Sequence, residues 1–173
     1  RTLPLRIEFS EDGSYKHVGR TEGYGINEGQ WQKYTVAVRN TTNNDIQDVQ
    51  VWLTEIDPVP QEVAGYIPLP LHVTHASPHV HTMTLTAQER RLVDVVSFFN
   101  KFWQPDILLE HTSPVAKREC YCDEAGYEIE LMVKGTGARP SKRRFRIGVE
   151  ARNLFMTSLD QPSEEAMLEA FET

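Results

Sequence analysis

Cysteine is scarce in this sequence. Two cysteines, Cys120 and Cys122, occur among 173 residues. Side chains two residues apart in a strand point to the same side, but this spacing is poor for an intrachain disulfide. A Cys-x-Cys pair can supply two thiolates to a metal, yet neither a second cysteine pair nor a nearby histidine completes such a site in sequence. We therefore expect ordinary reduced thiols rather than a metal or redox pair, and they do not identify a compartment.

Long apolar segments, an excess of basic residues and familiar catalytic motifs are also missing. No run of about 18 or more apolar residues exists, so no segment reads as a transmembrane helix, and any membrane contact would come from a segment outside this sequence. The formal net charge of −7 argues against general nucleic-acid binding, for which a basic footprint is expected. The sequence has no nucleophile elbow, phosphate-binding loop, dinucleotide-binding glycine motif or zinc-protease motif. We therefore expect neither enzyme activity nor a nucleic-acid partner.

Period-two alternation of apolar and polar residues is the strongest positive signal, and it is typical of half-buried strands. It occurs in residues 5–9, 34–38, 49–53, 127–133 and 145–149. Residues 91–99 are apolar on both faces, which predicts a central strand, and we expect edge strands at 71–75 and 80–85. Three long stretches lack this alternation. The glycine-rich residues 10–30 are expected to form a loop or a ragged hairpin, and the proline-rich residues 57–70 a loop. Residues 100–126 receive no assignment.

Two hairpins are predicted. The turn-forming residues 40–45 separate the alternating segments 34–38 and 49–53, which should therefore pair. Near the C-terminus, pairing Leu131 with Phe145 and Ile129 with Ile147 would put both apolar sets on one face. The same register would place Glu130 opposite Arg146 on the solvent face, an ion pair of about 0.2–1 kcal/mol.

About eight strands with almost no internal helix predict an all-β fold, an antiparallel Ig-like β-sandwich of roughly 7–9 strands. We assign it to residues 1–160. Ser163 can cap a helix, and Met167, Ala170 and Phe171 form one apolar stripe, so residues 161–173 are expected to be a short C-terminal helical tail. Because the chain begins with Arg1 rather than Met, we expect a processed or truncated piece of a longer protein.

The segments Tyr34-Thr-Val-Ala-Val-Arg-Asn40 and Val49-Gln-Val-Trp-Leu-Thr-Glu55 resemble Ig-like or fibronectin-III-like accessory modules of bacterial proteins. In those modules a strand ending in Arg-Asn or Thr-Asn meets a turn and then a Val-x-Val-x-Leu strand. The segment Thr86-Ala-Gln-Glu-Arg-Arg-Leu-Val-Asp94 looks like the turn and strand that follow. The inter-sheet cysteine pair of antibody domains is missing. The resemblance implies a binding, spacer or assembly role and carries over no catalytic residue.

Histidine is concentrated in one short stretch. Four of the six histidines are His72, His75, His79 and His81. If residues 79–83 are extended, His79 and His81 share a face, and a neighbouring strand could bring His75 alongside. Neutral imidazoles bind zinc, copper or nickel, so this cluster is a candidate transition-metal site. The alternative is a polar hairpin in which Pro78 makes the turn.

Tryptophan and one aspartate provide the other candidate sites. Exposed tryptophans, above all Trp52 and Trp103, would suit a protein interface or sugar stacking, whereas buried ones would belong to the core. Asp94 lies in an apolar strand, where a carboxylate needs a partner such as Arg90 or a histidine from the 72–81 stretch. An Asp–His pair is either a structural hydrogen bond or one ingredient of catalysis.

The residues as a whole favour a non-catalytic Ig-like module that binds a protein partner or positions a neighbouring domain, without a cofactor. The alternatives are a metal-binding protein or metal-dependent enzyme that uses the histidine cluster, and a carbohydrate-binding module. The basic residues between 139 and 146 suit a solvated strand as well as an anionic partner. The compartment stays open: an upstream hydrophobic hairpin would mean the soluble domain of a membrane-anchored bacterial protein, and a signal peptide would mean export.

Overall fold

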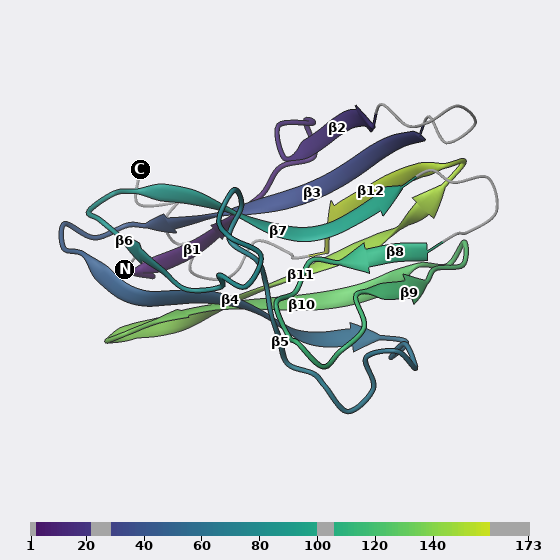
Figure 1. Ribbon diagram of the computed structural model, residues 1–173. Coiled ribbons are helices and arrows are strands. Elements are labelled where there is room, and N and C mark those ends of the chain that lie inside the picture. Colours follow the sequence, from purple (N-terminus) through teal and green to yellow (C-terminus); the bar gives the residue numbers. More distant parts are fainter. Residues whose placement is uncertain (1–2, 22–28, 100–105, 160–173) are drawn as a thin grey trace.

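The computed structural model describes residues 3–21, 29–99 and 106–159. Their twelve strands form two antiparallel sheets of six strands each, packed face to face (Figure 1). The predicted all-β sandwich is therefore confirmed. The strand count exceeds the expected seven to nine because several strands are only two to four residues long, too short for a visible alternation. The predicted helical tail, residues 161–173, lies outside the described residues.

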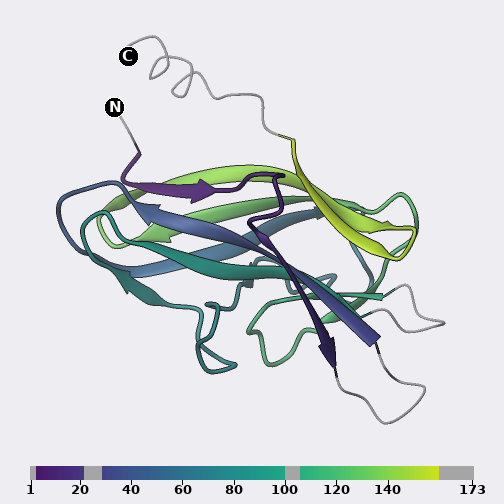
Figure 2. The same ribbon diagram turned by 90° about the horizontal axis from the view of Figure 1, so that it is seen from above.

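The first sheet is built around β3 and β7. Its members are β1 (Leu5–Glu8), β2 (Lys16–Thr21), β3 (Gly29–Asn40), β7 (Arg90–Phe99), β8 (Asp106–Leu109) and β9 (Glu119–Tyr121). Both β1 and β2 pair with β3, along different halves of it (Figure 2). The presence of β2 agrees with the ragged-hairpin interpretation of residues 10–30. Four consecutive residues of β7, Val93 to Val96, are buried, which confirms a central strand covered on both faces.

The second sheet is built around β4 and β10. Its members are β4 (Ile46–Asp57), β5 (Leu69–Pro70), β6 (Met83–Leu85), β10 (Tyr127–Gly135), β11 (Ala138–Glu150) and β12 (Asn153–Ser158). Alternate residues of β10, from Tyr127 to Val133, are buried between the sheets, as are Phe145 and Ile147 of β11. These are the predicted core positions. Burying one such aliphatic or aromatic side chain stabilises the fold by about 1.5–3 kcal/mol.

The predicted hairpin between 34–38 and 49–53 is wrong. β3 and β4 belong to different sheets, and the turn between them crosses from one sheet to the other. Asn40, fully buried, holds this crossing: its Nδ2 donates to the carbonyls of Asn44, Leu85 and Thr86, at 2.7, 3.1 and 3.0 Å. Its Oδ1 accepts from the backbone N–H of Thr42 at 2.9 Å. Asn40, the last residue of the first segment that carries the resemblance, therefore holds the connection between the two sheets in place.

The β10–β11 hairpin forms, but with a register two residues away from the predicted one. Ile129 lies opposite Phe145, and Glu130 lies opposite Arg144 rather than Arg146. A shift of two preserves the face of every side chain, so the buried set is unchanged. The difference arises at the turn. Gly135 pairs with Ala138, so the loop between the strands is tighter than expected, and a bulge lies between Val133 and Gly135.

Residues 69–74 change sheets and thereby position the site described next. Leu69 and Pro70 pair with β4, and the Leu71 N–H donates to the Val51 carbonyl of the same strand at 2.9 Å. Val73 then bridges to Val93 of β7 in the first sheet. The edge strand expected at 71–75 is thus reduced to isolated bridges, because this segment divides its hydrogen bonds between two sheets.

Candidate functional site

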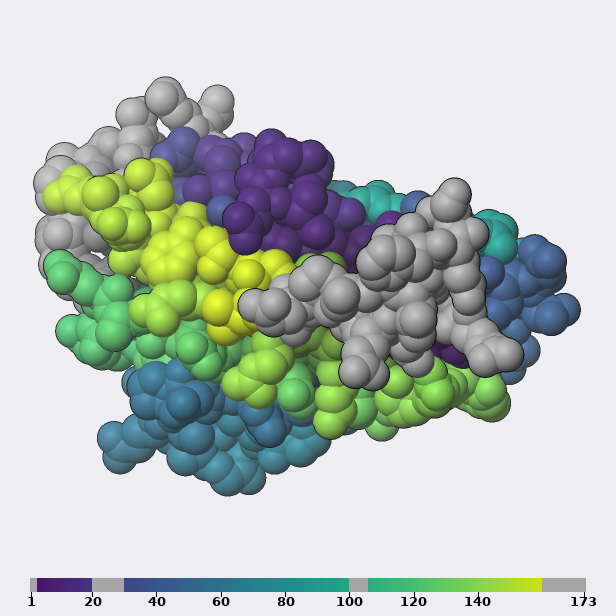
Figure 3. All heavy atoms as spheres, turned by 180° about the vertical axis from the view of Figure 1, so that it is seen from behind, coloured from purple at the N-terminus to yellow at the C-terminus, as the bar shows by residue number. Residues whose placement is uncertain are grey.

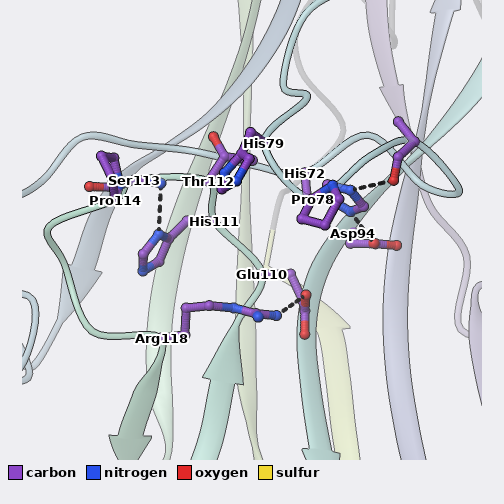
Figure 4. A pocket seen from close by; sticks show the side chains of 11 residues that line it. His72, Pro78, His79, Asp94, Glu110, His111, Thr112, Ser113, Pro114 and Arg118 are labelled. Carbon is purple, nitrogen blue, oxygen red and sulfur yellow. Dashed lines mark hydrogen bonds and ion pairs between the residues drawn. The ribbon is translucent and has the colours of Figure 1, made fainter.

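A cleft of about 340 Å³ lies between the loop that follows the sheet-changing segment and the loop between β8 and β9 (Figure 4). The two loops lie side by side in both ribbon views (Figures 1 and 2). The cleft is lined by His72, Ala76, Pro78, His79, Asp94, Glu110, His111, Thr112, Ser113, Pro114 and Arg118. Its volume falls within the range of about 300–1,000 Å³ that is common for ligand sites.

Asp94 anchors one wall of the cleft. It alternates along β7 with Val93 and Val95 of the core, so its side chain points away from the core, yet it is only 3% exposed. Its carboxylate accepts from His72 Nδ1 at 2.8 Å (Figure 4). It also accepts from the Thr74 hydroxyl at 2.7 Å, and Lys33 Nζ lies 3.1 Å from it. The expected pairing of Asp94 with a histidine is present. Arg90, the other expected partner, instead donates to the Tyr15 hydroxyl at 3.0 Å.

The His72–Asp94 pair lacks the geometry of a catalytic dyad. A general base needs one ring nitrogen free to take a proton from a nucleophile. The Nε2 atom of His72 is instead 3.0 Å from each of two backbone carbonyls, those of Ala76 and Ser77. Ser97, on the same strand as Asp94, donates its hydroxyl proton to Glu110 at 2.6 Å. In this arrangement the pair connects β7 to the turn at residues 76–77.

The polar side chains of the opposite wall also have hydrogen-bond partners within the protein. The carboxylate of Glu110 accepts from Arg118 Nη2 at 2.6 Å (Figure 4). It also accepts from the Ser97 hydroxyl. His111 accepts the Ser113 N–H at its Nδ1 (3.1 Å), so its Nε2 carries the proton and donates it to the Lys117 carbonyl at 2.9 Å. Burial lowers the pKa of this histidine, which favours the neutral ring. In the described part of the chain, no buried side-chain nitrogen or oxygen lacks a hydrogen-bond partner.

The four candidate metal ligands are not gathered at one point. His72 and His79 line the cleft, whereas the Nδ1 atom of His81 lies 3.2 Å from the Thr112 hydroxyl oxygen. His75 is exposed, and its backbone has a φ of 66°. Among the described residues, no group of three or more histidine, cysteine, aspartate or glutamate side chains could hold a metal ion. The proposed transition-metal site therefore gains no support from the arrangement of these histidines.

Trp52, the other candidate binding residue, is linked to the cleft through His81. It is half-buried on the outer face of β4, between Pro70 of β5 and Met132 of β10 in neighbouring strands. Its ring meets that of His81 edge-on at 6.1 Å, and His81 contacts the cleft residue Thr112. The histidine stretch and Trp52 are thus joined by side-chain contacts, a link that the sequence could not reveal because it depends on a loop contact.

The indole of Trp52 is partly engaged already. Its Nε1 donates to the Gln50 side chain at 2.9 Å, and Lys134 Nζ lies 4.8 Å from the ring centroid. Trp31 packs against Gly19 on the neighbouring strand β2, where a Cβ atom would meet its ring. Trp103 lies outside the described residues.

No protein-family model matches the chain, and no curated protein or solved structure matches it either. Within the described ranges, no helix is long and apolar enough to cross a membrane.

The basic segment at residues 139–146 and the cysteine pair, the two remaining features of the sequence, have structural roles. Arg144 of the basic segment makes ion pairs with Glu55, Glu128 and Glu130 on the outer face of the second sheet, at 3.1 to 3.8 Å. Cys120 and Cys122 are both reduced and buried. Burial, with smaller contributions from neighbouring acids, raises the pKa of Cys120 to about 12, so its thiol is protonated and unreactive at neutral pH.

Proposed function

We propose that this chain is a non-catalytic Ig-like module that binds a protein partner across the cleft and the adjoining Trp52. The observation that carries the proposal is the contact chain from the cleft through Thr112 and His81 to Trp52. Two features that the sequence offers as separate candidates, the histidine stretch and the tryptophan, are thus in contact with each other.

The chemistry of the cleft favours binding over catalysis. A catalytic group must have an atom available to the substrate, whereas both ring nitrogens of His72 are already hydrogen-bonded. Glu110 is likewise held by Ser97 and Arg118. Fully satisfied polar groups make the walls rigid, and rigid walls lower the entropic cost of binding a partner.

The composition of the surface resembles that of a protein interface. Trp52, Met132 and Pro70 form a half-buried apolar row, and Arg118 at the rim of the cleft is half-exposed. Tryptophan, methionine and arginine are enriched at interfaces between proteins, where a few such residues provide most of the binding energy.

The Ig-like assignment rests on the resemblance of residues 34–55 and 86–94, together with the two-sheet sandwich. Neither alternative function is favoured by a particular observation. The four histidines are spread over separate contacts, and Lys134 lies over the Trp52 ring, where a sugar would have to stack.

The test uses photo-crosslinking in the cells that naturally produce the protein, with the full gene product. A photoreactive amino acid replaces His79 at the exposed rim of the cleft, and Glu124, exposed in a turn elsewhere, is the control position. We expect a specific crosslinked protein from position 79 and none from position 124. In a Trp52→Ala background, that product should fall by about tenfold or more, as expected for an interface anchor.

The outcome that contradicts the proposal is equally clear. Crosslinks of the same pattern from positions 79 and 124, or a product from position 79 that persists unchanged with Trp52→Ala, would show that this surface is not the binding site. Thermal unfolding of the Trp52→Ala protein, compared with the parent, distinguishes a lost contact from a lost fold.

A further inference from the structure

His72 connects two parts of the molecule through both sides of its ring. Its Nδ1 is 2.8 Å from the Asp94 carboxylate, on β7. Its Nε2 is 3.0 Å from each of the carbonyls of Ala76 and Ser77, in the turn that forms a wall of the cleft. The ring therefore spans from the sheet to the turn, with an oxygen atom facing each nitrogen.

These three oxygens determine the protonation of the ring. A backbone carbonyl can only accept, so Nε2 must carry a hydrogen to bond with Ala76 and Ser77. The carboxylate of Asp94 already accepts the Thr74 hydroxyl at 2.7 Å and faces the Lys33 ammonium at 3.1 Å, so it acts as an acceptor toward its neighbours. Nδ1 must then donate as well. Both nitrogens are donors only in the imidazolium ion, so the observed geometry is that of a charged His72.

We propose that His72 is a protonation-dependent latch, which as an imidazolium ties the 76–77 turn to Asp94 and which releases that turn when one ring proton is lost. After deprotonation one nitrogen holds a lone pair, and an oxygen atom faces it on either side of the ring. One of the two connections must then break, because two acceptors cannot share a hydrogen bond.

The segment that would move is small and well defined. The base of the loop keeps its own hydrogen bonds, since the Val73 N–H donates to the Val80 carbonyl at 3.0 Å. Between these residues, the Ala76 N–H donates to the Val73 carbonyl (3.1 Å) and the Val80 N–H to the Ser77 carbonyl (3.0 Å), while the Thr74 N–H holds the start of the loop to the Leu92 carbonyl of β7 (3.1 Å). Release would therefore displace the wall made by Ala76, Pro78 and His79, and with it the shape of the cleft.

Several charged or titratable groups surround the latch. Lys33 of β3 shares the Asp94 carboxylate, and His17 of β2 lies 3.0 Å from Thr35 on the same outer face. His75 and His79 belong to the loop itself, and the Glu110–Arg118 pair lines the opposite wall. The experiment must therefore follow the His72 ring itself rather than pH alone.

The experiment is a nuclear magnetic resonance titration of the whole chain through the histidine range, about two pH units on either side of pH 6.5. The ¹⁵N shifts of the His72 ring report its protonation, and amide protection factors at Ala76 and Val80 report the turn. We expect both ring nitrogens to carry protons whenever the turn is protected. Protection should fall by about tenfold or more in step with the loss of the His72 proton, as the loss of a charge-assisted hydrogen bond implies.

Two variants sharpen the measurement. In Asp94→Asn the amide group can donate to a neutral Nδ1, while the Nε2 hydrogen still reaches the two carbonyls, so protection of the turn should no longer depend on His72 protonation. His79→Gln, an exposed change in the same loop, should leave the coupling as it is in the parent protein.

A His72 ring with a single N–H in the protected state would overturn the proposal, and so would an equal loss of protection in Asp94→Asn. If Asp94→Asn fails to fold, the titration of the unaltered chain still decides. The measurement needs no partner, so its outcome is independent of the crosslinking test of the proposed function.

Discussion

His111 is buried as a neutral ring, and this makes the stability of the fold sensitive to mild acid. Burial lowers its pKa below the ordinary value of 6.5, so the unfolded chain takes up a proton more readily than the folded one. The stabilisation is complete above pH 6.5 and is lost as the pH falls below it. Burial lowers the pKa of His17 too, with the same sign.

We therefore predict that His111→Asn keeps more of its pH 8 stability at pH 5 than the parent protein does, measured as the shift of the urea midpoint of unfolding between the two pH values. An asparagine oxygen can still accept the Ser113 N–H, but it has no titrating group. His79→Asn, at the exposed rim of the cleft, is the matched control and should behave as the parent protein does. An equal acid effect in the parent and in His111→Asn would exclude this role for His111.

The sequence predicts only part of the hydrogen-bond network around Asp94. A lone carboxylate in an apolar strand indicates that a partner exists, and a histidine of the 72–81 stretch was a natural candidate. Lys33 and Thr74 could not be inferred, because they reach Asp94 through the pairing of β3 with β7 and through the sheet-changing segment. Period-two patterns contain no information about either relation.

Among the strand connections, two glycines adopt the left-handed backbone conformation in contrasting surroundings. Gly126 precedes β10 with a φ of 69°, and Gly137 lies in the β10–β11 turn with a φ of 71°. A Cβ atom at Gly126 would overlap the Ile147 carbonyl oxygen, whereas one at Gly137 would meet nothing within 4 Å. The two positions therefore share the conformational cost of a side chain and differ in the steric cost.

We predict that Gly137→Ala lowers the free energy of unfolding by about 1 kcal/mol, the cost of a left-handed alanine. Gly126→Ala should lower it by about 3 kcal/mol or more, because the β11 backbone must also move. Chemical denaturation of the two variants measures both values. Equal losses at the two positions would mean that the close approach of Gly126 to β11 is absent in solution.

Alternation predicts the elements themselves well, but not their partners. It identified the buried faces of β3, β4, β10 and β11, since burial of one face needs only local periodicity. It failed for the β3–β4 hairpin, because two strands with the same pattern fit equally well in one sheet or in opposite sheets. The buried Asn40 decides between these arrangements, and its partners Leu85 and Thr86 are more than forty residues away.

At the edge of the second sheet, the backbone of β12 and of the turn before it forms hydrogen bonds with side chains from the N-terminal part of the chain. Gln32 of β3, 1% exposed, accepts the Leu154 N–H at 2.8 Å and donates to the Arg152 carbonyl at 3.1 Å. Lys16 donates to the Leu154 carbonyl at 2.8 Å, and Glu11 accepts the Ser158 N–H at 2.9 Å. In Figure 3, β12 (yellow) lies beside the N-terminal segment (purple) that provides Glu11 and Lys16. The backbone groups of an edge strand are thereby satisfied within the chain, which opposes pairing with another molecule.

Gln32→Ala should therefore have two effects that a surface change would not have. It leaves the Leu154 N–H and the Arg152 carbonyl without their partner, which should lower the free energy of unfolding by about 2 kcal/mol. It also exposes part of the β12 edge, so we expect association that increases with protein concentration, measured by sedimentation velocity. Gln30→Ala, exposed on the same strand, is the control and should remain like the parent in both measurements. A destabilised Gln32→Ala protein that stays monomeric at every concentration would show that the remaining contacts of Lys16 and Glu11 are enough to protect the edge.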